Sequence, residues 1–409
     1  MVKILFLCLY PIDKPMHGGQ LRASNIVGEY RKNGHQVQVI GVQTSTFFDE
    51  TEDFDPVPEW DEMAAIIPDA SMMEDAAIAL LYADNDHYYE QLEQKITNVP
   101  DVIHAEQPWL FGFAQRYAQK HQQQDKKIKI IYGSQNIEYK LKEAIVSNYD
   151  SAEQVKIKKQ SVKQIELNTI KQADAIICVS KDDQEWIESQ LENSNTNTVL
   201  SPNGVTAWQA DDNAIITANE LSQGNKFALF CGSAHRPNIK GFFDMFSSGL
   251  GSLAYDEKLI IVGGAGGLIE QNPKYQQSAK LSESVIIAGL VEQECLFGLL
   301  DTAHCILLPI TQGGGTNLKT AEAIWAGHHV IATKTAMRGF EEFIGMPGIN
   351  VVEDSEPEQF KQQFRKVMQL PPIKIDNEQR ELRRSVLWPH YLKPLSELVL
   401  NLNNKQAPS

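Results

Sequence analysis

The 409-residue sequence contains no apolar run close to the roughly 20 residues that a helix needs to cross a bilayer. Its first segment, MVKILFLCLYP, carries one lysine and a short apolar run that ends at Pro11, without a small-residue cleavage site. This pattern favours a buried first strand over a signal peptide. We therefore expect a cytoplasmic protein.

Spacings typical of disulfide frameworks and metal sites are also missing. The five cysteines are odd in number, scattered, mostly inside apolar runs and without a CxxC pair, so we expect buried thiols. His328 and His329 are adjacent and would point to opposite faces of a strand. The sequence therefore predicts no metal site.

The sequence has no excess of basic charge. Its formal net charge is −16, which argues against a nucleic-acid partner because a phosphate backbone requires a basic surface. Two local basic runs occur, Lys126–Lys129 and Lys156–Lys163. They are typical of a solvated helix face, and the alternative is peripheral contact with anionic lipid at the inner membrane face.

Length and composition predict a globular protein with two domains. A chain of this length exceeds one ordinary core, and 42% hydrophobic with 22% charged residues are globular values. Short apolar segments alternate with helical stretches, which predicts an α/β fold with parallel sheets. In the first half the expected strands are Lys3–Leu9, Gln36–Val42, Val102–His104, Lys129–Tyr132, Ala175–Val179 and Asn197–Leu200. In the second half they are Lys226–Gly232, Lys258–Val262, Val285–Ala288, Cys305–Pro309, Val330–Thr333 and Asn350–Val352.

Two stretches interrupt this alternation. The segment 47–98 is first rich in acidic residues and then has helical apolar spacing from about Met72 to Ile96, so we expect an insertion there. The turn cluster Pro202-Asn203-Gly204 closes the first half, and we expect a linker near Thr206 to Gln223.

The most informative segment is GGGTNLKTAEAIWAG, from Gly313 to Gly327. Glycines allow a backbone to approach a ligand closely, and the first turn of a helix exposes N–H groups that suit an anion. An apolar stripe would face inward, formed by Leu318, Ala321 and Trp325. Lys319 opposes the helix dipole and precedes Glu322, which disfavours an ordinary surface pair. We expect Lys319 to contact a phosphate and Glu322 to accept two ribose hydroxyls.

This segment resembles the donor-binding motif of retaining glycosyltransferases with the GT-B fold, specifically the large family 4, also called glycosyl transferases group 1. The resemblance implies two Rossmann-like domains with a donor-binding cleft between them. It implies that Glu322 holds the ribose of a nucleotide sugar and that the nearby backbone faces the diphosphate, at Gly314, Gly315, Thr316, Asn317 and Leu318. Family members usually have an acid at the place of Gly314, which grips the transferred sugar; Gln312 and the neighbouring amides would take its place here.

The similarity extends along nearly the whole chain. VSKDDQEWI from Val179 and SPNGV from Ser201 resemble the crossing between the two domains, with Thr206 where the family usually has an aspartate. We expect an N-terminal acceptor-side domain over 1–206 and a nucleotide-sugar-binding domain over 207–385. The remaining segment, 386–409, would form a helix that packs back on the N-terminal domain.

FCGSAHRPNIKGF, from Phe230, places Ser233, Arg236 and Lys240 just past a strand end, where open α/β sheets bind ligands. Family resemblance implies that Arg236 and Lys240 face the diphosphate and stabilise the leaving nucleotide, with Ser233 beside the donor. The alternative is a solvent-exposed turn with incidental charges.

Two N-terminal segments complete the expected site. Gly18 and Gly19 in MHGGQLR follow the first strand, where the family has a glycine loop between the donor diphosphate and the acceptor. DVIHAEQPW, from Asp101, places Glu106 where the family often has a histidine that contacts the donor sugar. Glu106 is either a catalytic, acceptor-orienting carboxylate or a satisfied loop acid, and His104 is expected in the core.

Together these features predict a metal-independent retaining glycosyltransferase of hexosyltransferase type that needs no cofactor. The donor would be a nucleotide sugar, expected to carry uridine diphosphate, and the acceptor a glycan or a lipid-linked molecule. Retention is implied by the resemblance alone. Two other interpretations stay open: a GT-B binding or scaffold protein without catalysis, and a GT-B epimerase that acts on the nucleotide sugar itself.

Overall fold

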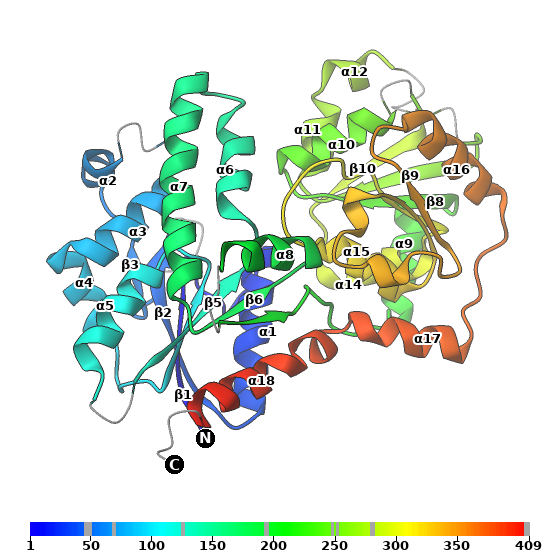
Figure 1. Cartoon of the computed structure of the whole chain (residues 1–409). Coiled ribbons are helices and arrows are strands. Elements are labelled where there is room, and N and C mark those ends of the chain that lie inside the picture. Colours follow the sequence, from blue (N-terminus) through cyan, green and yellow to red (C-terminus); the bar gives the residue numbers. More distant parts are fainter. Residues whose placement is uncertain are drawn as a thin grey trace. The chain divides into compact units, whose positions relative to one another are not determined.

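The computed structural model describes residues 1–44, 51–67, 71–123, 127–191, 196–246, 249–250, 253–278 and 283–404. Contacts between residues divide the chain into two compact units (Figure 1). Unit 1 comprises Met1–Pro202 and Tyr391–Ser409, and unit 2 comprises Asn203–His390. The domain boundaries expected from the sequence, at 206 and 385, lie close to these positions.

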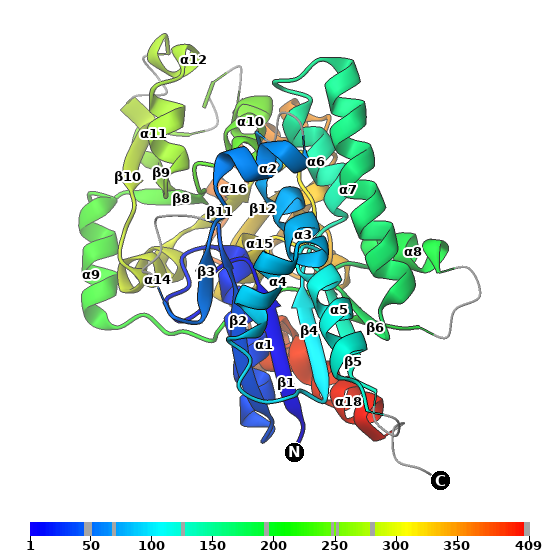
Figure 2. The same ribbon diagram turned by 90° about the vertical axis from the view of Figure 1, so that its left-hand side faces the viewer.

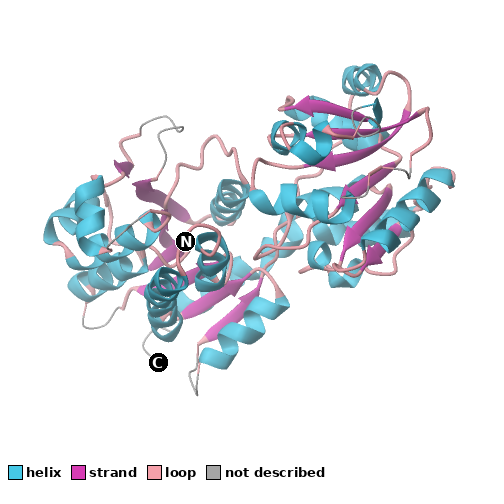
Figure 3. Ribbon diagram, turned by 90° about the horizontal axis from the view of Figure 1, so that it is seen from above, coloured by secondary structure: helices cyan, strands magenta, loops and turns pink. Residues whose placement is uncertain are grey.

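Unit 1 is built on a parallel sheet. Its described residues form seven strands in the order β3-β2-β1-β4-β5-β6-β7. The strands are β1 (Lys3–Cys8), β2 (Gln36–Gln43), β3 (Phe54–Pro56), β4 (Val102–Glu106), β5 (Lys129–Ser134), β6 (Ala175–Cys178) and β7 (Asn197–Leu200). Every residue of β4 and β6 is buried, as expected for strands that have helices on both faces (Figure 3).

Helices connect the strands of unit 1. They are α1 (Gly18–Lys32), α2 (Trp60–Ile66), α3 (Glu74–Asp84), α4 (Asp86–Glu93), α5 (Phe111–His121), α6 (Glu138–Val146), α7 (Ala152–Gln172) and α8 (Lys181–Gln190). The longest of them, α7, begins with a capping box in which Ser151 and Gln154 satisfy each other's backbone N–H groups. The C-terminal helix expected from the sequence is α18 (Trp388–Asn404), which belongs to unit 1 from Tyr391 onward.

Unit 2 has the same type of architecture. Its described residues form six parallel strands in the order β10-β9-β8-β11-β12-β13. The strands are β8 (Lys226–Cys231), β9 (Glu257–Val262), β10 (Val285–Gly289), β11 (Cys305–Leu308), β12 (His329–Thr333) and β13 (Ile349–Val352). The helices are α9 (Asp212–Leu221), α10 (Arg236–Phe246), α11 (Ala265–Glu270), α12 (Pro273–Gln276), α14 (Gln293–Thr302), α15 (Leu318–Ala326), α16 (Pro357–Gln369) and α17 (Asn377–Arg383).

An aromatic cluster fixes α10 on the sheet of unit 2. The rings of Phe230 on β8 and Phe242 on α10 lie 5.8 Å apart between centroids, and those of Phe246 on α10 and Phe360 on α16 lie 5.7 Å apart. All four side chains are at most 1% exposed. Aromatic side chains of this size contribute large buried areas, so the cluster holds the start of α10 in a defined position at the end of β8.

Both sheets reverse their strand order at one point. In unit 1 the reversal lies between β1 and β4, since β1 pairs with β2 on its other side (Figure 2). In unit 2 it lies between β8 and β11. Open α/β sheets bind ligands outside the carboxyl ends of the strands at such reversal points. Each unit therefore has one favoured position for a ligand.

The expected strands are confirmed to within two residues at either end. Three expectations were wrong in detail. The helix expected over 72–96 is two helices, because Asn85 has extended backbone and its side chain accepts from His87 N to begin α4. The expected linker contains α9, which packs on α14. Among the cysteines, Cys231 and Cys295 are partly exposed rather than buried.

Within the described parts of the chain, no helix combines the length and the apolar character that membrane crossing requires.

Candidate functional site

The glycine-rich loop of unit 2 leads into an uncapped helix. Gly313 and Gly315 have backbone φ angles of 133° and 60°, values that residues other than glycine rarely adopt. Helix α15 begins at Leu318, and the side chain of its N-cap residue, Asn317, makes no capping hydrogen bond. The N–H groups of the first turn therefore lack the side-chain acceptor that usually satisfies them, as an anion-binding helix start requires.

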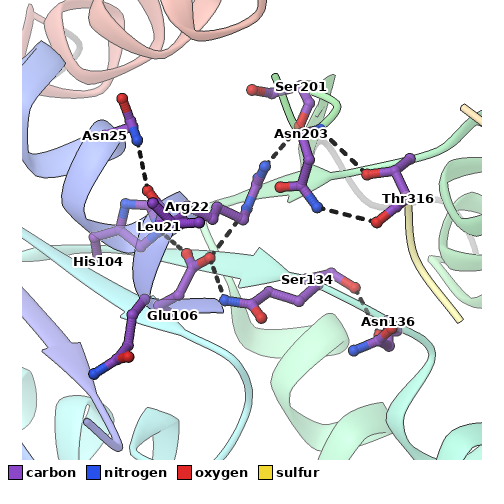
Figure 4. Close-up of polar contacts among 12 residues, drawn as sticks. Leu21, Arg22, Asn25, His104, Glu106, Ser134, Asn136, Ser201, Asn203 and Thr316 are labelled. Carbon is purple, nitrogen blue, oxygen red and sulfur yellow. Dashed lines mark hydrogen bonds and ion pairs between the residues drawn. The ribbon is translucent and has the colours of Figure 1, made fainter. Parts of the chain in front are cut away.

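Contacts on both sides hold this loop in place. The Nδ2 of Asn203 donates to the carbonyl of Thr316 over 3.3 Å, and the backbone N of Asn203 donates to Thr316 Oγ1 over 3.2 Å (Figure 4). On the other side, the Nε of Arg338 donates to the carbonyl of Gly315 over 2.7 Å. The carbonyl groups of Gly315 and Thr316 are thus both occupied. Gly314 is exposed at the tip of the loop.

Lys319 is held by an asparagine that the sequence analysis missed. The Nζ of Lys319 donates to the Oδ1 of Asn238 on α10 over 2.8 Å. The Nδ2 of Asn238 donates in turn to the carbonyl oxygen of Ser233, 2.9 Å away, and lies 3.2 Å from its Oγ. Asn238 is 6% exposed. Asn238 therefore links the lysine of α15 to the loop after β8. In the sequence, only its place between Arg236 and Lys240 in RPNIK could have indicated this role.

Glu322 lies one turn after Lys319, with a carboxylate that no group satisfies. Among the described residues it has no hydrogen-bond partner. Burial raises the pKa of Glu322 to about 7, although the charge of Lys319 opposes the shift. Burial likewise lowers the pKa of Lys319, and nearby Cys231 and Glu322 oppose that shift. Glu322 is partly exposed, and its oxygens are not among the fully buried atoms without a partner, so the hydroxyl groups of a ligand can reach this carboxylate.

The two basic residues expected to form a pair differ in position. Arg236 is the first residue of α10 and is exposed. Lys240 is half-exposed, and its Nζ lies 2.6 Å from Asp244 Oδ2, which also accepts from the hydroxyl of Thr311 over 2.7 Å. The charge of Lys240 is thus matched by a carboxylate one turn further along α10, and its expected contact with a diphosphate stays a prediction. Lys319 instead donates to Asn238, which in turn donates to Ser233.

The glycine loop of unit 1 lies at the start of α1. His17 is the N-cap residue, and its Nδ1 accepts from Gln20 N over 3.4 Å. A Cβ on Gly19 would lie 2.8 Å from the hydroxyl oxygen of Tyr10 and 3.2 Å from Oε1 of Gln135. Close packing therefore requires glycine at position 19. Gly18, the first residue of α1, is partly buried.

Glu106 belongs to a buried polar network in unit 1. Its carboxylate accepts from Arg22 Nε at 3.1 Å and from Gln135 Nε2 at 2.9 Å, and His104 Nε2 lies 2.8 Å away (Figure 4). The side chain is fully buried. His104 is also buried, as expected, and its Nδ1 lies 3.0 Å from the hydroxyl of Tyr30.

The network bears on the two interpretations of Glu106. Burial alone would raise the pKa of Glu106, but the His104 contact and the charge of Arg22, with the Gln135 bond, lower it below its usual value. Glu106 is a buried, satisfied acid at the end of β4, which agrees with the second interpretation. Its catalytic, acceptor-orienting role stays a prediction, and the sequence did not indicate the donors that enclose it.

Three lysines of the two basic runs pair with acids. Lys126 lies outside the described residues. The Nζ of Lys129 lies 2.7 Å from Asp174 Oδ1, and that of Lys159 lies 2.7 Å from Glu143 Oε1. Lys158 is buried and pairs with Asp150 over 2.9 Å, which corrects the expectation of a solvated face at that position. Among the described residues, no cluster of three or more histidine, cysteine or acidic side chains could hold a metal ion.

Comparisons with known proteins extend these observations. A family model described as Glycosyltransferase Family 4 matches residues 16–208, and one described as Glycosyl transferases group 1 matches residues 225–369. No curated protein matches the sequence. The two models together span most of the chain, with one in each unit.

The fold is similar to those of solved GT-B enzymes. Sucrose-phosphate synthase from Thermosynechococcus elongatus superposes with a TM-score of 0.67 at 13% identity, covering 99% of this chain and 100% of that one. The UDP-forming α,α-trehalose-phosphate synthase from Burkholderia vietnamiensis gives 0.67 at 11% identity, covering 100% and 98%. HepE from Anabaena, solved in complex with UDP-glucose, gives 0.58 at 14% identity, covering 99% and 98%. The two Rossmann-like units are thus those of a GT-B fold.

Proposed function

Since the chain belongs to the family 4 glycosyltransferases with the GT-B fold, we propose that it transfers a sugar from a uridine diphosphate donor to a hydroxyl group of a glycan or lipid-linked acceptor. The donor binds in unit 2, at the reversal point between β8 and β11. The reaction retains the configuration of the transferred sugar and needs no metal ion or cofactor.

The observation that carries the proposal is the arrangement of Lys319 and Glu322 on α15. The uncapped N–H groups of the helix start and the amine of Lys319 are donors for diphosphate oxygens. One turn later, the unsatisfied carboxylate of Glu322 accepts from the two hydroxyl groups of a ribose. The protein thus offers donors for phosphate oxygens and, one helical turn away, an acceptor for hydroxyl groups. A nucleoside diphosphate carries both of the matching groups, a diphosphate and a ribose.

The same groups support the chemistry. As the bond between the sugar C1 and the phosphate oxygen breaks, negative charge develops on the leaving diphosphate. The helix N–H groups and Lys319 stabilise that charge, with Arg236 available from the exposed start of α10. The new bond joins C1 to the acceptor oxygen. The acceptor proton passes to the leaving phosphate on the same face, so a separate protein base is not required.

Two of the similar structures support uridine as the base. One is named as a UDP-forming synthase, and another was solved with UDP-glucose bound. Gly314 stands where family 4 members usually have an acid that grips the sugar, so in the proposed complex Gln312 and the loop amides take that part. Gln312 and Gly314 are exposed at the tip of the loop.

A thermal-shift screen of nucleotide sugars tests the proposal. A ligand at 100 times its dissociation constant stabilises the folded protein by about 2.7 kcal/mol, which gives a measurable shift. We expect uridine diphosphate sugars to stabilise the protein more than the guanosine and adenosine forms. If no nucleotide stabilises it, the donor site is misassigned.

Product analysis without acceptor separates the other interpretations. Slow release of free sugar indicates a transferase, an altered nucleotide sugar indicates an epimerase, and binding without turnover indicates a scaffold. The cytoplasmic location and the peripheral membrane contact stay predictions, which cell fractionation tests.

A further inference from the structure

A cavity of about 360 Å³ lies at the reversal point of the sheet in unit 1. Its volume is within the usual range of ligand pockets. Residues that follow β1, β2 and β4 line it together with the first turn of α3: Tyr10, Thr44, Glu74, Asp75, Gln107 and Trp109. Because residues that follow β1 and β4 line it, the cavity occupies the position in unit 1 where this type of sheet binds ligands.

Two polar side chains in the lining have no partner. Among the described residues, neither the carboxylate of Glu74 nor the side-chain amide of Gln107 makes a hydrogen bond or an ion pair. Both side chains are partly buried. A carboxylate that accepts and an amide that both donates and accepts are suited to hydroxyl groups.

The backbone of Gln107 is strained. Its φ is 68°, in the left-handed region that favours glycine, and its N–H donates to the carbonyl of Gly133 over 2.8 Å. Strained residues of this kind persist only where the surrounding structure holds them in place, and they are found most often at ligand sites. The strain sets the direction of the chain at the wall of the cavity.

The charge of the lining is negative. Asp75 is paired with Lys142 over 2.8 Å, and Lys142 also donates to the carbonyl of Met72. Glu74 has no such cation, and the cavity lining contains no lysine, arginine or histidine. A ligand with a phosphate or carboxylate group would meet Glu74 without a compensating charge. Like charges at close range repel each other.

The helix dipole of α3 explains the two acids only in part. Glu74 and Asp75 lie in the first turn of α3, where acids favour the helix dipole by about 0.3–1 kcal/mol. That preference explains the residue type. It does not explain a cavity in front of Glu74, the strain at Gln107 or the two aromatic side chains in the same wall.

Tyr10 and Trp109 belong to the lining, and because both are almost completely buried they make it rigid. The hydroxyl of Tyr10 accepts from Gln135 Nε2 over 2.9 Å, and Trp109 is 1% exposed. Ligand pockets typically combine such aromatic walls with a few polar groups that set orientation. A sugar ring has both kinds of surface, with C–H groups on its faces and hydroxyl groups at its edge.

We propose that this cavity binds the acceptor as an uncharged, hydroxyl-bearing sugar residue and that Glu74 and Gln107 determine its specificity. Glu74 accepts from two acceptor hydroxyl groups and excludes phosphorylated sugars. The inference rests on the proposed transferase function, because an acceptor is required only if a donor is turned over.

The test uses the full chain and the uridine diphosphate sugar that the thermal-shift screen selects. Release of uridine diphosphate is measured with methyl glycosides of glucose, galactose, mannose and N-acetylglucosamine, and with glucose 6-phosphate and mannose 6-phosphate. We expect at least one neutral glycoside to stimulate release and the sugar phosphates to have no effect. The inference is overturned if only a sugar phosphate stimulates release of uridine diphosphate, or if no neutral glycoside does.

Variants assign the effect to the cavity. Glu74→Gln is expected to raise the KM for the neutral glycoside about tenfold with little change in kcat, and Glu74→Lys to abolish stimulation by it. The matched control is Glu90→Lys, a charge reversal on the exposed face of α4 in the same unit. If Glu74→Lys behaves like Glu90→Lys, Glu74 does not contact the acceptor.

A parallel measurement keeps the two proposals distinguishable. Affinity for uridine diphosphate and release of sugar to water, both without acceptor, should be the same in Glu90→Lys and in the unaltered protein. If both are normal while the acceptor results fail, the cavity assignment is wrong and the transferase function stands. If neither is detectable in the unaltered protein, the transferase function itself fails.

Discussion

The amine of Lys319 on α15 and the side-chain oxygen of Asn238 on α10 lie 2.8 Å apart, and the same asparagine donates to the carbonyl of Ser233. One neutral side chain thus orients the lysine and the loop after β8 together. An uncharged acceptor holds the lysine without matching its charge, so the charge stays available to an anion. A carboxylate at position 238 would not leave it available.

Replacement of Asn238 tests this relationship. Asn238→Ala should weaken binding of uridine diphosphate about three- to tenfold, since one hydrogen bond that orients Lys319 is lost. Asn238→Asp should weaken it more, because the new charge pairs with Lys319 and repels the diphosphate. Titration calorimetry measures both, with Asn213→Ala on the exposed surface of α9 as the control. Equal affinities in all four proteins would remove Asn238 from the site.

The strands were predictable because of their surroundings. Strands such as β4 and β6 are buried on both faces and therefore read as apolar runs. The three-residue edge strand β3, Phe54–Pro56, contains an aspartate and a proline and has no such run. Its pairing with β2 depends on the rest of the sheet, so its sequence gave no signal.

The donor helix was predictable because its chemistry is local. Glycines, a helix start and two charged residues fall within ten positions, so spacing alone brings them together. Asn238 and Asn203 act on partners 81 and 113 positions away, and Arg22 reaches Glu106 across 84. Contacts at that separation exist only after folding. This is why the positions holding the loop, and the burial of Glu106, were not foreseen.

Glu322 should make stability depend on pH. Burial raises the pKa of Glu322 to about 7 in the folded protein, above its value near 4.5 in the unfolded chain. The ionised carboxylate therefore costs stability, and the cost grows as the pH rises from about 4.5 to 7. Glu322→Gln should change the free energy of unfolding little at pH 4.5 and raise it by about 1–3 kcal/mol at pH 8. Equal differences at the two pH values would contradict the buried environment of this group.

Two glycines on α1 form a matched pair. A Cβ on Gly19 would meet Tyr10 and Gln135, whereas a Cβ on Gly28 meets nothing within 4 Å. Gly28→Ala should stabilise the protein by about 0.5–1 kcal/mol through helix propensity. Gly19→Ala should displace Tyr10 and Gln135, and Gly19→Val more so.

The Gly19 variants should lose more turnover than nucleotide affinity, because the proposed nucleotide contacts lie in unit 2. Transfer rate and affinity for uridine diphosphate are measured in parallel for Gly19→Val and Gly28→Val. Full activity in Gly19→Val would place the loop outside the site. An equal loss of both quantities would show that unit 1 also binds the donor.

Glu106 should be important for folding. Glu106→Ala leaves the buried guanidinium of Arg22 without its carboxylate, which typically costs about 3–5 kcal/mol. Because the pKa of Glu106 is lowered in the folded state, its contribution is complete above pH 4.5 and is lost as the pH falls through the folded value. Urea unfolding at pH 7 measures the cost. Glu90→Ala is the exposed control and should change stability by less than about 0.5 kcal/mol; a similar value for Glu106→Ala would refute the network.

Turnover should continue without divalent metal. In the proposed complex, Lys319, Arg236 and the helix N–H groups supply the positive charge that a metal ion provides in other glycosyltransferases. EDTA should leave the rate of sugar release unchanged. Loss of activity that magnesium or manganese restores would show that these groups are insufficient.

The central claim is that unit 2 holds a uridine nucleotide through the start of α15 and the carboxylate of Glu322. Calorimetric titration of uridine diphosphate into the unaltered protein, Glu322→Ala and Glu220→Ala tests it most directly, since Glu220 is an exposed acid on α9 in the same unit. The loss of two charge-assisted hydrogen bonds to ribose should weaken binding by about 1.5–3 kcal/mol, roughly ten- to hundredfold, in Glu322→Ala alone. Unchanged affinity in a folded Glu322→Ala protein, or no binding to the unaltered protein, would contradict the claim.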